Sequence, residues 1–145
     1  MSPKVSLPFL LLLFCCLLLK AQGQGLSADE LFANARLAAF DKKDYPKAIQ
    51  LSKAALEKNP DYTELRVFLG RLYTWSDQAD SARQAFKQAL ITEPSNADAH
   101  LAFASLEFWE DQPGKALELV NSGLKYHSES EELLLLKAKI LDDLK

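Results

Sequence analysis

Apolar and polar positions recur with a helical spacing along most of the chain, in segments separated by short polar links. Seven segments have this pattern: 28–41, 45–57, 62–75, 79–92, 96–109, 114–126 and 130–144. Links such as DKKD, SDQAD and EDQPG are so short that consecutive helices must lie antiparallel. The pattern therefore predicts an all-α fold in which the segments pair into helix hairpins.

Residues at the segment ends support this division. Asp29, Asp61 and Asn96 lie at or near the starts of first helices, where a side-chain oxygen can accept a hydrogen bond from a free backbone amide. Prolines occur in the first turn of second helices or directly after them, positions in which the missing N–H is tolerated or stops the helix. These prolines are Pro46, Pro113, Pro60 and Pro94.

The hairpins repeat with a period of 34 residues. Sliding the chain by this period superimposes four sets: Ala48, Ala82 and Ala116; Ala55, Ala89 and Gly123; Pro60 and Pro94; Trp75 and Trp109. A small residue at a fixed point in each period lets two helix backbones approach closely. We therefore expect Ala82 and Ala116 at helix junctions, with Gly70 in the same role and Tyr73 and Phe86 filling the space beside them.

The residues of the central period resemble a known repeat. Residues 63–96 are similar to a tetratricopeptide repeat, with Leu69-Gly70-x-x-Tyr73, Ala82, Phe86, Ala89 and Pro94 in the pattern positions. Residues 29–62 and 97–130 resemble two further repeats, and residues 131–144 resemble a first helix only. The resemblance implies a solenoid over residues 24–145, composed of three repeats and a C-terminal helix.

The resemblance also implies a function and a binding surface. Such arrays are generally scaffolds that bind peptides or proteins and carry out no chemistry, so we expect no enzyme activity and no cofactor. Their first helices line a concave groove. The corresponding residues here are Val67, Arg71, Thr74 and Trp75, followed by Leu101, Ser105, Phe108 and Trp109.

Two of these residue types have alternative interpretations. Trp75 and Trp109 could form a ledge for an apolar anchor, since tryptophan is enriched in binding hot spots, or they could cover the turn of the neighbouring repeat. Arg71 could hold a carboxylate of the partner or pair with an acidic residue of the chain itself. Leu133 to Leu136 cover more than one helix face, so we expect some of them to be exposed.

The N-terminus predicts export. A short basic start is followed by an apolar run from Leu7 to Leu19 and by the small residues Ala21 and Gly23, as in a secretory signal peptide of residues 1–23. An uncleaved membrane anchor is the competing interpretation, but the run is shorter than the roughly 20 residues that a span requires. Cys15 and Cys16 lie within the signal, so the mature chain would be free of cysteine and disulfides. We expect a periplasmic or secreted protein.

The charge of the chain and the motifs that it lacks argue against nucleic-acid-binding, metal-binding and catalytic functions. The chain has 17 basic and 20 acidic side chains, and removal of Lys4 and Lys20 leaves 15 against 20, a net charge of −5. Without a basic stripe, nucleic acid is not an expected partner. His100 and His127 lie in different helices, and neither a metal-binding nor a catalytic motif is present.

A second functional hypothesis follows from one run of residues. The run RLYTWSDQADSA, residues 71–82, is similar to repeat segments that precede an outer-membrane β-barrel in some Gram-negative bacterial proteins. On this alternative the chain is a detached or truncated periplasmic module that associates with outer-membrane components as a spacer or assembly aid.

Overall fold

The computed structural model describes residues 25–145, so the predicted signal peptide, with Cys15 and Cys16, lies outside the described residues. The described chain contains helices and no strand, which confirms the all-α prediction. In chain order the helices are α2 (Ala28–Phe40), α3 (Tyr45–Lys58), α4 (Thr63–Trp75), α5 (Ala79–Thr92), α6 (Ala97–Trp109), α7 (Pro113–Tyr126) and α8 (Glu131–Asp143).

The helix boundaries lie close to the predicted ones, but only one of the three predicted capping residues acts as a cap. Asp61 does not, since α4 begins after Tyr62 without a side-chain cap. The Asn96 side chain caps α6 by accepting a hydrogen bond from the backbone amide of Ala99 at 2.9 Å. Helix α2 starts differently from the expectation. Ser27, not Asp29, is its N-cap, because the Ser27 hydroxyl and the Glu30 carboxylate each bond the other residue's backbone amide in a capping box.

The turns within the three hairpins share one backbone feature, a single left-handed residue. Lys43, Asp77 and Asp111 have φ values of 52°, 55° and 56°, and they are spaced by the repeat period. A single left-handed residue reverses the chain within a few residues, and aspartate tolerates this conformation better than most side chains. Each hairpin therefore reverses direction through one such residue.

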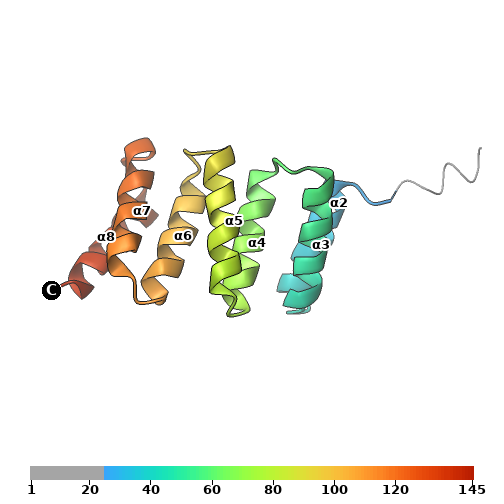
Figure 1. Ribbon diagram of the computed structural model, residues 1–145, viewed down its shortest axis with the longest axis horizontal. Coiled ribbons are helices and arrows are strands. Elements are labelled where there is room, and N and C mark those ends of the chain that lie inside the picture. The colour runs from blue at the N-terminus through green and yellow to red at the C-terminus, as the bar shows by residue number, and fades with distance from the viewer. Residues whose placement is uncertain (1–24) are drawn as a thin grey trace, which may run out of the picture.

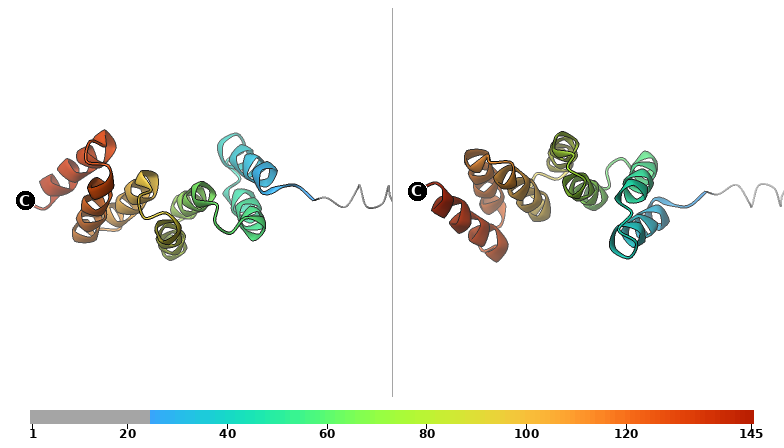
Figure 2. Two further views of the ribbon diagram at one scale, coloured as in Figure 1. Left: turned by 90° about the horizontal axis from the view of Figure 1, so that it is seen from above. Right: turned by 90° about the horizontal axis from the view of Figure 1, so that it is seen from below.

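The hairpins stack in a row in chain order (Figure 1), with α2, α4, α6 and α8 forming one layer and α3, α5 and α7 the other (Figure 2). The core is divided in the same way. Each of three buried clusters takes its side chains from one hairpin and from the first helix of the next. Helix α8 completes the last cluster by burying Leu133 and Ile140 fully. The fold is therefore a solenoid, in which each repeat is stabilised by its neighbour.

Small residues lie at the helix crossings, as the period predicted. The recurring positions Ala48, Ala82, Ala116, Ala55, Ala89 and Gly123 are all buried. Helices α4 and α5 approach closely at Gly70, where an added Cβ would lie 2.4 Å from Cε1 of the Phe86 ring. Phe86 is itself fully buried, and its ring packs against that of Phe103 with 5.8 Å between the centroids.

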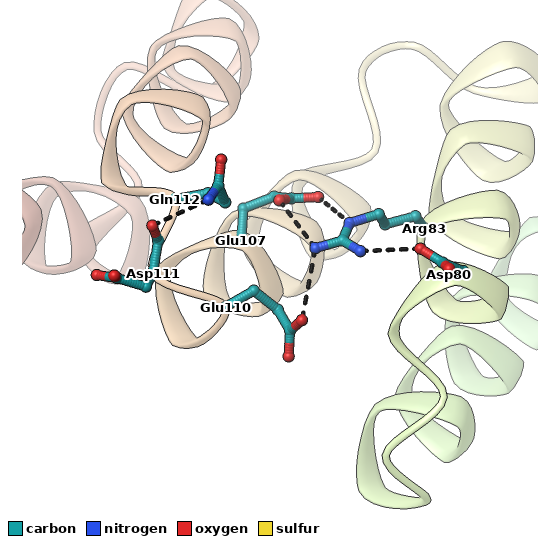
Figure 3. A network of polar contacts seen from close by, with 6 residues as sticks. All are labelled: Asp80, Arg83, Glu107, Glu110, Asp111 and Gln112. Carbon is teal, nitrogen blue, oxygen red and sulfur yellow. Dashed lines mark hydrogen bonds and ion pairs between the residues drawn. The ribbon is translucent and has the colours of Figure 1, made fainter.

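An ion pair joins the second repeat to the third. Arg83 on α5 donates to the Glu107 carboxylate on α6, with 2.7 Å between Nε and Oε1, and also contacts Asp80 and Glu110 (Figure 3). The Glu107 side chain is only 3% exposed. Its hydrogen bond to Arg83 is the main cause that raises the pKa of this guanidinium. The pair therefore fixes how α6 lies against α5.

We predict that Gly70→Ala lowers the free energy of unfolding by about 1–3 kcal/mol, because the new methyl group overlaps the Phe86 ring. Gly114→Ala in α7 is the matched control. Nothing lies within 4 Å of a Cβ there, so the better helix propensity of alanine should leave stability equal or higher. Urea unfolding of both variants measures the difference, and equal effects would contradict the crossing geometry.

We predict that Arg83→Met lowers the free energy of unfolding by about 3 kcal/mol, because it leaves the buried Glu107 carboxylate without its cation. Adding Glu107→Leu should restore most of the loss. Arg71→Met, which removes the exposed ion pair between Arg71 and Asp98, is the control and should cost less than about 1 kcal/mol. Similar losses in the two single variants, measured by urea unfolding, would argue against the role of Arg83.

Candidate peptide-binding groove

Exposed aromatic side chains end the first helices of all three repeats. Phe40 ends α2, Trp75 ends α4 and Trp109 ends α6, and their side chains are 55%, 41% and 65% exposed. Large apolar side chains are costly to leave in water, so a row of them marks a surface that could bind another molecule.

A hollow of about 180 Å³ lies between α4 and α6 and is closed at its base by Phe86 and Ala102. Its volume is below the range of roughly 300–1,000 Å³ that holds a drug-sized ligand, so it suits a single large side chain. Six of the eight residues predicted for the groove line it: Arg71, Thr74, Trp75, Leu101, Ser105 and Trp109.

The other two predicted residues lie outside this hollow. Val67 is 2% exposed and belongs to the core cluster that also contains Phe86, because α6 packs over this part of α4. Phe108 packs toward the last hairpin, where the Lys139 ammonium lies 5.5 Å from its ring centroid. Both side chains therefore pack against neighbouring helices and not into the hollow.

The groove also extends along α2. Sliding the chain against itself by the repeat period did not indicate this part of the groove. A hollow of about 660 Å³ is lined by Phe32, Arg36, Phe40 and Glu64, among others. The same four residues also line a smaller hollow that reaches Arg71, and Arg71 lines the hollow beside the tryptophans. The three hollows therefore form one continuous groove along the first helices.

A shift in the repeat period explains why Phe40 was missed. The link between α2 and α3, residues 41–44, is one residue longer than the link between α4 and α5, residues 76–78. Phe40 consequently precedes Trp75 by 35 residues, and sliding the chain by 34 does not superimpose them. A search for aromatic residues at the ends of the predicted helices would have found it.

Trp75 combines the two roles considered for it: it covers the neighbouring repeat and it also lines the groove. Its ring centroid lies 6.0 Å from that of Phe40 and 5.9 Å from that of Tyr45, so it covers the preceding hairpin. Its remaining surface lines the hollow shared with Trp109. Trp109 is the more exposed of the two and has the larger surface available for contact.

Arg71 pairs with an acidic residue of the chain itself. Its guanidinium donates to the Asp98 carboxylate, which links α4 to α6 across the groove. The two side chains are 37% and 57% exposed. Arg71 therefore takes the second of its two predicted roles, the pairing with an acidic residue of the chain itself.

Acidic side chains line the opening of the groove near the starts of α2 and α4. Tyr62 lies between them, and the pKa of its hydroxyl is raised, first by burial and then by a hydrogen bond to the Asp29 carboxylate. The negative charges of Asp29 and Glu64 act in the same direction. This end of the groove therefore has a negative potential.

Both histidines contact backbone carbonyl oxygens in the link between α5 and α6. Nε2 of His100 lies 2.9 Å from the Pro94 carbonyl oxygen, and Nε2 of His127 bonds the Ser95 carbonyl oxygen.

Within residues 25–145, no group of three or more His, Cys, Asp or Glu side chains is arranged to hold a metal ion. None of the helices in that part of the chain combines the length and the apolar character that a membrane crossing requires.

The fold defines a class, the α-solenoids built from stacked helix hairpins. The tetratricopeptide repeat family matches the chain over residues 39–90 and 76–140, which together span more than half of its length. The chain belongs to this family. A search of curated proteins found no match.

Solved structures agree with the assignment at the level of the fold. The first tetratricopeptide repeat domain of Spaghetti (RPAP3), bound to the HSP90 peptide SRMEEVD, is 17% identical with a TM-score of 0.74, covering 81% of this chain and 95% of that one. The Sgt2 domain of Aspergillus fumigatus is 21% identical with a TM-score of 0.74, covering 81% and 78%. The Arabidopsis OM64 domain is 13% identical with a TM-score of 0.73, covering 81% and 96%.

Proposed function

We propose that this protein binds a peptide segment of a partner protein in the groove formed by α2, α4 and α6. The tetratricopeptide repeat fold is that of a protein–protein interaction scaffold. The position of the binding site is our proposal, and it rests on one observation. Trp75 and Trp109 come from successive repeats and line the same hollow while keeping 41% and 65% of their surfaces exposed.

The physical basis of binding is burial of these rings. A partner side chain that fills the hollow removes water from two aromatic surfaces, and tryptophan contacts of this kind dominate many interfaces. The residues that line the groove lie on packed helices, so little free energy is needed to order it on binding. The Spaghetti domain, which has the same fold, is bound to a peptide, and this supports the choice of a peptide as the ligand.

We predict that Trp75→Ala/Trp109→Ala abolishes detectable partner capture by the immobilised protein. Two lost hot-spot side chains weaken binding by about 4 kcal/mol, or roughly a thousandfold. Ile91→Ala is the matched control, because Ile91 is 70% exposed on α5 and does not line the groove. Circular dichroism confirms that each variant is folded. Recovery of the same partners by the double variant would exclude the groove as the binding site.

Tryptophan fluorescence provides an independent measurement. The chain has only two tryptophans, and both line the hollow, so its tryptophan emission comes from the groove alone. A captured partner should shift this emission to shorter wavelength as water leaves the rings. Binding without any change in emission would place the partner elsewhere.

We also propose that the protein is exported, on the basis of the predicted signal peptide of residues 1–23. N-terminal sequencing of the protein from fractionated cells should find a chain that begins near Gln24, in the periplasm or the medium. A full-length chain in the soluble cytoplasmic fraction would contradict export. The alternative of an outer-membrane-associated module gains no support from the comparisons and stays a sequence-based hypothesis.

A further inference from the structure

The chemistry of the ligand can be inferred from the charges that line the groove, if the groove is the binding site proposed above. The side chains that line its three hollows include four carboxylates and two guanidinium groups, which gives a net charge of −2. The carboxylates are Asp29, Asp41, Glu64 and Asp98, and the guanidinium groups are Arg36 and Arg71.

The two cations differ in their partners, and among the residues that line the hollow over α2 the single guanidinium of Arg36 faces the three carboxylates of Asp29, Asp41 and Glu64. Arg71 is paired with Asp98, and the Arg36 guanidinium lies 5.9 Å from the centroid of the Phe32 ring. Within residues 25–145, Asp29 and Glu64 belong to no ion pair. The negative charges near the start of the groove are therefore the ones available to a ligand.

An acidic residue in the first turn also stabilises its own helix, so the charges alone do not define a site. The aromatic side chains beside them supply the second observation. Phe40, Trp75 and Trp109 present exposed rings along the same groove, and the faces of such rings attract cations. Carboxylates and aromatic rings together favour lysine and arginine and disfavour an acidic ligand.

We infer that the groove selects an extended segment that carries a large apolar side chain and one or more lysine or arginine residues. The apolar side chain occupies the hollow between Trp75 and Trp109. The cationic residues lie toward α2, beside Asp29 and Glu64.

Two synthetic peptides test this inference directly. The first is SRMEEVD, and the second is SRMKKVK, which keeps the apolar residues and reverses the three acidic charges; both are acetylated and amidated to remove the terminal charges. Binding is followed by tryptophan emission and by calorimetry. SRMKKVK should bind at least on the order of tenfold more tightly, and the difference should decrease as salt is added.

Charge-neutralising variants locate the effect. Asp29→Asn/Glu64→Gln should remove most of the preference for SRMKKVK. Glu57→Gln/Glu118→Gln makes the same change in net charge on the exposed surfaces of α3 and α7, away from the groove, and should keep the preference. Circular dichroism checks that both variants are folded.

The outcomes separate this inference from the proposed function. Equal or tighter binding of SRMEEVD, or a preference that survives in Asp29→Asn/Glu64→Gln, would overturn the inference and leave the groove as the binding site. Failure of both peptides to bind would also overturn it. The proposed function itself fails only if the Trp75→Ala/Trp109→Ala variant keeps its partners.

Discussion

The close approach of α4 and α5 at Gly70 is the constraint on which the rest of the structure depends. The Phe86 ring occupies the space that a side chain at this position would need, and Ala82 and Ala89 leave room for the same crossing. Because α4 and α5 lie close together, the first helix of the next repeat, α6, packs against both of them and completes the core cluster. The same arrangement of small residues recurs in each hairpin and produces a regular stack.

The groove is a consequence of this stacking. When each hairpin packs against the next, the C-terminal ends of successive first helices lie side by side on one surface. Phe40, Trp75 and Trp109 occupy those ends, so their exposed rings form a row. The ion pair between Arg83 and the buried Glu107 carboxylate links α5 to α6, the helix that carries Trp109. Stability and binding thus depend on the same interfaces between repeats.

The fold could be predicted from the sequence because helix ends and small residues are local signals. Asn96, the prolines and the recurring alanines each have a steric or hydrogen-bonding reason that does not depend on distant residues. The groove was predicted only in part. Val67 belongs to the core because α6 covers it, and Arg71 is neutralised by Asp98, a residue 27 positions away. Such contacts depend on how the repeats lie against one another, which a single period does not specify.

The central claim is that ligands bind along the first helices, and amide and indole NMR spectra of the ¹⁵N-labelled protein test it most directly. On titration with SRMKKVK, the account predicts shifts of both indole N–H signals and of backbone amides in α2, α4 and α6, while α3, α5 and α7 stay unchanged. Shifts confined to the second helices or to α8, with the Trp75 and Trp109 indole signals unmoved, would contradict it.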